Sequence, residues 1–293
     1  MNDRKVKKRR ALLITLLCSL TALLLAGGIL LLAANEHHLF LFAQRTGLFQ
    51  SQIRVEEGEI AAPLTKSLED WLKDERVSLD QSMMLVNTEY TLKEDFVPAI
   101  SEYKTSGVLM NDCMKEAYAR LSEAVTEEKQ VKLYVSSHFR TPEKQEELYL
   151  EDPLTATLPG ASEHQTGLCV DVYVAYYAGD GFLKSPAGRF VNSHCHEYGF
   201  IIRYPVYGED STGIRFEPWH IRYVGQPHAT VIQKNRLTLE EYILSMKEGQ
   251  WYEAQGYFFC RQRGENGLTL PEDFSSALIS DDNTGYYILT VTP

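Results

Sequence analysis

The chain has 293 residues, a formal net charge of −11 and 44% hydrophobic residues. This length allows one large domain or one domain with smaller additions, and the apolar content excludes wholesale disorder. Residues 1–10 carry six Lys or Arg and one Asp, so the remaining chain carries −16, the difference between −11 and +5. Such an acidic body has little positive charge to neutralise phosphates, which argues against nucleic acid as a partner.

An uncharged apolar stretch, residues 11–34, follows the basic N-terminus. As a helix it would extend about 36 Å, which is enough to cross a hydrocarbon core of about 30 Å. The alternative is a cleaved signal peptide, but the apolar part of such peptides usually has about 7–15 residues. We therefore predict a cytoplasmic basic tail (1–10) and a single transmembrane anchor (11–34). The rest of the chain would then lie outside the cell membrane.

The pattern after the anchor divides the chain into three further parts. Residues 35–78 are polar and irregular and are interpreted as a stalk, whereas residues 79–228 have the texture of a globular α+β domain. A boundary is expected within 226–237, and residues 229–293 would then form a small α+β appendage. The four cysteines beyond the membrane are interpreted as buried small residues with at most one disulfide, because their spacing matches no zinc-finger or CxxC pattern.

The first half of the predicted domain begins with a short strand and loop at 83–92. Residues 111–125 place apolar side chains at helical spacing, which predicts an amphipathic helix. Residues 131–140 are β-branched and alternating, which indicates a strand that runs into a loop. Thr141 as N-cap and Pro142 at the first position then start a helix.

The second half contains a buried strand at 167–174, a short helix that Gly199 ends, and a further strand at 201–205. Residues 215–225 include Pro218, so they form either an edge strand or a strand with a local irregularity. A helix at 237–249 and several short strands complete the chain.

Two short segments carry metal-binding chemistry. In the first, His164 lies in a loop, and Asp171 follows seven residues later on the next strand. A turn at Gly167 can bring both side chains onto one cation at about 2.0–2.2 Å. In the second, a Pro-induced irregularity can turn Glu217 and His220 toward the same cleft, with His220 on the metal and Glu217 on its water.

Two histidines and one carboxylate leave a fourth coordination position open, as a hydrolytic zinc ion requires. The sequence therefore predicts a Zn²⁺ site of His164, Asp171 and His220 with Glu217 as general base. Four other histidines are interpreted as solvated or structural: His138, His194, His196 and His228.

Residues from about 80 to 225 resemble a VanY-type D-alanyl-D-alanine carboxypeptidase. Four segments carry the resemblance: SSHFRTPEKQ (136–145), SEHQTGLCVD (162–171), HEYGFIIRYP (196–205) and EPWHIRYVG (217–225). The resemblance implies an α+β fold with a small antiparallel sheet, flanking helices and a zinc site in a cleft. It also implies the three metal ligands and the base named above.

The resemblance further implies that Arg140 and Gln145 bind the substrate and that Ser162 contacts it. Arg140 offers a planar, two-donor partner for a terminal carboxylate, and it stands beside a predicted helix N-terminus that favours anions. The sequence departs from the family at Ser137-His138-Phe139, where Ser-Gly-Tyr is usual.

We therefore expect a zinc-dependent D,D-carboxypeptidase that removes the C-terminal D-alanine from peptidoglycan stem peptides, in glycopeptide resistance or in ordinary wall trimming. Three alternatives stay open. They are an L,D-carboxypeptidase that acts on tetrapeptide stems, a peptidoglycan endopeptidase and an inactive wall-binding module. Glu217 argues against the last, since a pure binding module has no need of a base.

Overall fold

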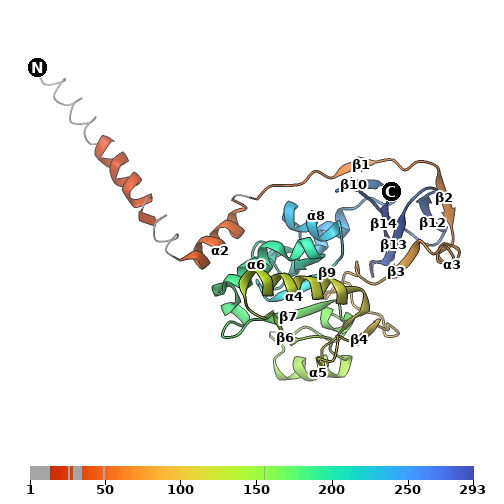
Figure 1. Ribbon diagram of the computed structural model, residues 1–293, viewed down its shortest axis with the longest axis horizontal. Helices are drawn as coiled ribbons and strands as arrows, with labels where there is room; N and C mark the ends of the chain where they lie inside the picture. The colour runs from red at the N-terminus through yellow and green to blue at the C-terminus, as the bar shows by residue number, and fades with distance from the viewer. Residues whose placement is uncertain (1–13, 26, 29–34, 49, 155) are drawn as a thin grey trace, which may run out of the picture. The chain divides into compact units, whose positions relative to one another are not determined.

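The computed structural model describes residues 14–25, 27–28, 35–48, 50–154 and 156–293 (Figure 1). The chain divides into two compact units, Met1–Phe49 and Gln50–Pro293. In the first unit, residues 14–25 are helical, and a second helix, α2 (Glu36–Thr46), ends at Gly47 with φ 68°. Among the described residues, no helix combines the length and the hydropathy of a membrane span. Residues 1–10 of the predicted basic tail, and residues 11–13, 26 and 29–34 of the predicted anchor, lie outside them.

The second unit contains the small antiparallel sheet that was expected. Its strands occur in the order β6 (Tyr134–Ser137), β7 (Cys169–Tyr173), β9 (His220–Tyr223) and β8 (Phe200–Ile202). Helix α4 (Lys115–Lys129) lies along this sheet (Figure 1). Its apolar side chains pack in one cluster with those of the sheet, where Leu121 and Val170 are fully buried. The α+β class is thereby confirmed.

Short elements surround this sheet. Helix α5 (Pro142–Glu151) begins as predicted, because the Thr141 side chain accepts a hydrogen bond from the Lys144 backbone N–H. Helix α6 (Pro186–His194) continues into a 3-10 turn that ends at Gly199 with φ 84°. The remaining elements of this part are β4 (Ile100–Glu102), β5 (Leu109–Asn111), the 3-10 helices Asp112–Met114, Glu163–Thr166 and Gly179–Lys184, and α7 (Glu209–Thr212).

A second, six-stranded sheet joins the two ends of the unit. Its order is β1 (Glu56–Gly58), β10 (Trp251–Ala254), β11 (Tyr257–Gln262), β14 (Tyr287–Thr292), β13 (Ser276–Asp281) and β3 (Val77–Asp80). Beside it, β2 (Pro63–Lys66) pairs with β12 (Leu268–Pro271), and α3 (Leu68–Trp71) follows β2. Figure 1 shows the orange strands β1 and β3 with the blue strands of the C-terminal part. Helices α8 (His228–Asn235) and α9 (Leu239–Ser245) precede strand β10 in the sequence.

These pairings correct the predicted domain boundaries. Residues 56–80 do not form a stalk, because β1, β2 and β3 pair with C-terminal strands and Trp71 is buried among them at 1% exposure. The boundary predicted at 228/229 falls at the start of α8. Ile201, before this boundary, and Ile288, after it, belong to one buried hydrophobic cluster, so residues 229–293 are not a separate appendage.

Two local predictions also need correction. Residues 83–92 form no strand, although Met83 and Leu85 are buried. Of the two alternatives for residues 215–225, the edge strand is wrong, because β9 lies between β7 and β8 and Pro218 lies just before it. Because Pro218 precedes the strand, its missing N–H costs the sheet no hydrogen bond.

Candidate metal-binding active site

Two neighbouring strands and one tight turn bring the predicted metal ligands together. Asp171 on β7 lies directly opposite His220 on β9 in the antiparallel register. His164 lies on the 3-10 turn before β7, and Gly167 ends this turn with φ 68°. A Cβ at Gly167 would lie 2.6 Å from Ile100 Cγ2, so glycine lets the turn pack closely against β4. The return of the chain at Gly167 places His164 beside the strand pair.

The donor atoms have the spacing of a zinc site. His164 Nε2 lies 3.5 Å from Asp171 Oδ2, and His220 Nδ1 lies 3.0 Å from Asp171 Oδ1. Tetrahedral ligands at about 2.1 Å from zinc are about 3.4 Å apart. Burial raises the pKa of Asp171, but the two histidines outweigh it and hold the pKa well below its usual range. The carboxylate is therefore available in its charged form, and the three side chains fit a zinc ion.

The orientation of His164 follows from its backbone contact. Its Nδ1 lies 2.9 Å from the carbonyl oxygen of His138. A carbonyl only accepts hydrogen bonds, so Nδ1 carries the proton and Nε2 keeps its lone pair for a metal. His138, interpreted from the sequence as solvated or structural, thus orients a ligand through its backbone.

Cys169 is a fourth potential donor that the sequence interpretation missed. Its sulfur and one nitrogen each of His164 and His220 lie within 4.8 Å of one another, and the residue is fully buried. Burial raises the pKa of Cys169, but the adjacent imidazoles outweigh it and bring the pKa to about 7. The strand alternation of Cys169 and Asp171, two residues apart, places both on one face and could have revealed this position. All the described cysteines are free thiols.

The turn before β9 directs Glu217 and His220 to the same place. The Glu217 N–H donates to the Tyr204 carbonyl at 3.0 Å, and the His220 N–H donates to the Glu217 carbonyl at 3.1 Å. Asn192 Nδ2 donates to the Pro218 carbonyl at 2.8 Å. Glu217 Oε2 consequently lies 3.8 Å from His220 Nδ1. Burial, with a further contribution from Asp171, raises the pKa of Glu217 despite the opposing effect of His220.

Arg140 and Gln145 form a linked pair at the start of α5. Arg140 Nη1 donates to Gln145 Oε1 at 2.9 Å, and Gln145 Nε2 donates to the Thr157 carbonyl at 2.7 Å. The Arg140 N–H donates to the His164 carbonyl at 3.0 Å, which connects this pair to one of the predicted metal ligands. Arg140 Nε is buried and has no hydrogen-bond partner among the described residues.

One cleft contains all the residues predicted from the sequence for the site. Its volume of about 160 Å³ is below the roughly 300–1,000 Å³ of pockets for drug-sized ligands, so it suits the end of a peptide. The lining comprises Arg140, Gln145, Ala156, Thr157, Ser162, Glu163, His164, Asp171, Tyr204, Ile214, Glu217, Trp219 and His220. Glu163, Tyr204 and Trp219 had no assigned role in the sequence analysis.

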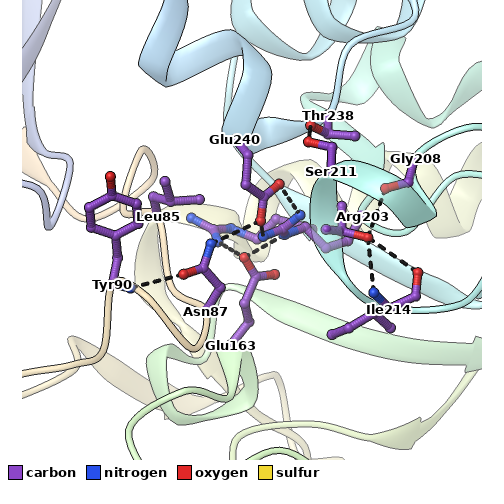
Figure 2. Close-up of polar contacts among 12 residues, drawn as sticks. Leu85, Asn87, Tyr90, Glu163, Arg203, Gly208, Ser211, Ile214, Thr238 and Glu240 are labelled. Atoms are coloured by element: carbon purple, nitrogen blue, oxygen red, sulfur yellow. Dashed lines mark hydrogen bonds and ion pairs between the residues drawn. The ribbon is translucent and has the colours of Figure 1, made fainter.

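Glu163 is the most deeply buried charge in this cleft. Its Oε1 accepts from Arg203 Nε at 2.7 Å and from Arg222 Nη1 at 2.6 Å. Figure 2 shows the Arg203 end of this network, where Glu163 and Glu240 approach the arginine from different elements. Burial alone would raise the pKa of Glu163, but the two arginines outweigh it and hold the pKa well below its usual range.

Comparisons with known proteins show which family this chain resembles. Residues 107–226 match the family model "VanY: D-alanyl-D-alanine carboxypeptidase". A D-alanyl-D-alanine carboxypeptidase of Enterococcus faecium is 30% identical over 283 residues, which covers 86% of this chain and 89% of that protein.

Two solved structures are also similar to this chain. The vancomycin-resistance D,D-dipeptidase VanXYg, in complex with a D-Ala-D-Ala phosphinate analogue, shares the fold at a TM-score of 0.62 and 24% identity. The match covers 81% of this chain and 99% of that one. The D,D-pentapeptidase VanY of a VanB-type resistance cassette, solved as a variant in complex with Zn(II), has a TM-score of 0.50 and 30% identity. That match covers 55% of this chain and 98% of that one.

Proposed function

Because this chain belongs to the VanY family of D-alanyl-D-alanine carboxypeptidases, we propose that its cleft holds zinc and removes the C-terminal D-alanine from peptidoglycan stem peptides. The observation that carries the proposal is the convergence of three donors: His164 Nε2, His220 Nδ1 and the Asp171 carboxylate. Their separations suit the tetrahedral geometry of zinc.

In this proposal the catalytic roles are shared between the metal ion and the carboxylate of Glu217. His164, Asp171 and His220 would hold the zinc ion, which would supply Lewis-acid polarisation of the scissile carbonyl and lower the pKa of a bound water. Glu217 accepts the proton of the attacking water and delivers it to the departing amine nitrogen. The partial burial of Glu217 and its raised pKa support this role, since a proton that it has accepted is held more readily than by a solvated glutamate.

Recognition of the peptide end falls to Arg140. Its guanidinium pairs with the terminal carboxylate, and Gln145 holds it in place through the 2.9 Å hydrogen bond. The N-terminus of α5 at Pro142 adds a favourable field for an anion. Ser162, buried in the same cleft, contacts the bound peptide.

The location of the enzyme is a further part of the proposal. We place residues 11–34 in the cell membrane as a single-pass anchor and the catalytic unit on the outer side, where the wall is assembled. The uncharged segment, its basic flank and the exposed apolar side chains of the described residues 14–25 support this placement. Protease treatment of intact protoplasts tests it, because only an outward-facing catalytic unit is digested without lysis.

The decisive experiment is mass spectrometry of defined stem peptides after incubation with the purified protein. We expect a pentapeptide stem ending in D-Ala-D-Ala to lose one D-alanine, and a chelator to stop the reaction until zinc is restored. A matched stem ending in D-Ala-D-lactate serves as the control for the amide bond.

Each other product pattern identifies a competing function. Loss of D-alanine only from tetrapeptide stems would indicate an L,D-carboxypeptidase, and cleavage within cross-bridges would indicate an endopeptidase. Binding of all the stems without any product, by zinc-loaded protein, would overturn the enzymatic proposal in favour of a wall-binding module.

A further inference from the structure

Four buried charged side chains lie directly behind the proposed metal site. Arg203 bridges two carboxylates: its Nε contacts Glu163 Oε1 at 2.7 Å, and its Nη1 and Nη2 contact Glu240 at 2.8 and 2.6 Å (Figure 2). Arg222 Nη1 contacts the same Glu163 oxygen at 2.6 Å. The side chains of Glu163, Arg203 and Arg222 are at most 1% exposed. Two arginines and two glutamates balance in charge, so the cluster can remain ionised in the interior.

One oxygen of this cluster has no partner within it. Both arginines use Glu163 Oε1, whereas Glu163 Oε2 has no hydrogen-bond partner among the described residues. The same is true of His220 Nε2, which lies 3.8 Å from that oxygen. A closure of less than about 1 Å would make a normal hydrogen bond between the two atoms. Two unpaired buried atoms that face each other, one of which can donate and one accept, indicate a contact that forms when the site is filled.

The direction of this contact determines which nitrogen of His220 faces the cleft. His220 Nδ1 lies 3.0 Å from Asp171 and 3.8 Å from Glu217, on the side of the proposed zinc ion. If a carboxylate holds the proton on Nε2 of His220, the lone pair is left on Nδ1. In His164 the two nitrogens are exchanged, because the His138 carbonyl holds the proton on Nδ1 and leaves the lone pair on Nε2. Carboxylates that orient metal-binding histidines in this way typically contribute 10–100-fold in metal affinity.

We propose that Glu163 is a positioning residue, which accepts a hydrogen bond from His220 Nε2 and so presents Nδ1 to the metal. This inference rests on the proposed function, because it concerns a ligand of the proposed zinc site. The arginines have a defined part in it. They occupy Oε1 and direct Oε2 toward the histidine, and Arg222 is itself fixed by the Ser82 and Met84 carbonyls at 2.9 and 2.7 Å. Glu240 on α9 then balances Arg203 from the C-terminal part of the chain.

The experiment compares Glu163→Gln with Glu240→Gln in the full-length protein. Both variants remove one carboxylate charge from Arg203, but only the first touches His220, so Glu240→Gln is a matched control for loss of a buried ion pair. The zinc dissociation constant is measured by competition with a chromophoric chelator, and the melting temperature is measured on each metal-free form. We expect Glu163→Gln to weaken zinc binding 10–100-fold and Glu240→Gln to leave it near the wild-type value, although both can lower the melting temperature.

A second measurement reports on the proton itself. In the zinc-loaded wild type, the His220 Nε2–H is expected as a slowly exchanging imidazole signal in ¹⁵N-edited spectra, and this signal should vanish or shift in Glu163→Gln but persist in Glu240→Gln. If Glu163→Gln does not fold, Glu163→Asp replaces it, since aspartate keeps the charge for the arginines while it draws the carboxylate back from His220. Equal zinc affinity in the Glu163 and Glu240 variants would overturn the inference. Failure of the wild type itself to bind zinc would instead overturn the proposed function.

Discussion

At the scale of single residues, the site depends on which atom of each side chain faces the cleft. His164 turns Nε2 inward because its Nδ1 contacts a backbone carbonyl, and His220 turns Nδ1 inward toward Asp171. Glu217 approaches the same place from the turn before β9, and its side chain keeps 22% exposure. Glu217 thus reaches the surroundings of the proposed ion and remains partly open to water, which suits it for proton transfer.

Glu217→Gln tests that assignment. The amide keeps the shape of the side chain but cannot accept a proton from water, so we expect kcat to fall by about 10²–10⁴-fold. Zinc affinity and melting temperature should stay near wild-type values, because His164, Asp171 and His220 are unchanged. Activity is measured as D-alanine release under zinc saturation. A variant with wild-type turnover would remove Glu217 from the role of base.

At the scale of elements, the turn that joins the 3-10 helix Glu163–Thr166 to β7 sets the distance between His164 and Asp171. Gly167 has φ 68° and sits against β4 and β5, where an added Cβ would lie 2.6 Å from Ile100 Cγ2 and 3.0 Å from the Asn111 nitrogen. The Asn111 backbone cannot move away easily, since its N–H donates to the Gly167 carbonyl at 2.8 Å. The spacing of the two predicted metal ligands thus depends on a residue without a side chain.

Gly167→Ala should therefore harm both stability and metal binding. Gly179→Ala is the matched control, because Gly179 also has positive φ (51°) but nothing lies within 4 Å of its Cβ position. The control should lose only the stability that a left-handed alanine costs, which is about 1–2 kcal/mol. Gly167→Ala should lose more and should also bind zinc more weakly, as thermal unfolding and chelator competition would show. Equal losses in the two variants would mean that the packing at Gly167 has no role.

At the scale of the whole molecule, segments that precede and follow the four-stranded sheet in the sequence pack together in one folded unit. The segment 56–80 supplies three strands to pairings with C-terminal strands, and Trp71 Nε1 donates to the Leu268 carbonyl at 2.7 Å. Arg203, just after β8, reaches Glu240 on α9 in the same way. The four-stranded sheet that carries the candidate site is consequently not independent of the segments that flank it.

Truncation tests this dependence. A chain that starts at residue 50 keeps the whole second unit, whereas one that starts at residue 79 loses β1, β2 and the buried Trp71. Loss of a buried tryptophan typically costs about 3–5 kcal/mol, and unpaired strands add to that cost. We expect the shorter protein to be largely unfolded or aggregated by circular dichroism and gel filtration. If it unfolds at the same temperature as the longer one, the N-terminal strands are dispensable.

His228 predicts how stability depends on pH. It lies between the Tyr242 hydroxyl and the Thr290 hydroxyl, 2.7 Å from each, and burial lowers its pKa to about 3. The unfolded chain, with a histidine pKa near 6.5, binds a proton first as the pH falls. Stability from this group is thus complete above about pH 6.5 and is lost progressively toward pH 3, by up to about 5 kcal/mol.

Denaturant unfolding of metal-free protein across this pH range checks the prediction. His228→Gln should unfold more easily than the wild type at pH 7 and should lose less stability between pH 6.5 and 3. Parallel curves for the two proteins would show that His228 does not carry the effect.

The sequence by itself predicted the candidate site and determined much of the local structure. The spacing of His164 and Asp171, the Glu217–His220 segment, the Thr141 cap and the Gly199 helix end are properties of a few neighbouring residues, and local geometry suffices to interpret them. The α+β class and the strands near the site follow from periodicity for the same reason.

Only the tertiary structure decided which distant segments belong together. Residues 56–80 have a polar pattern that does not predict strands. They form strands by pairing with residues about 200 positions later, and sequence periodicity cannot identify such distant partners. The places of Cys169 and Glu163 beside the metal ligands, and of Glu240 behind Arg203, likewise depend on how β7, β9 and α9 pack. Burial and long-range strand pairing depend on contacts between residues that are distant in the sequence, so only the tertiary structure shows them.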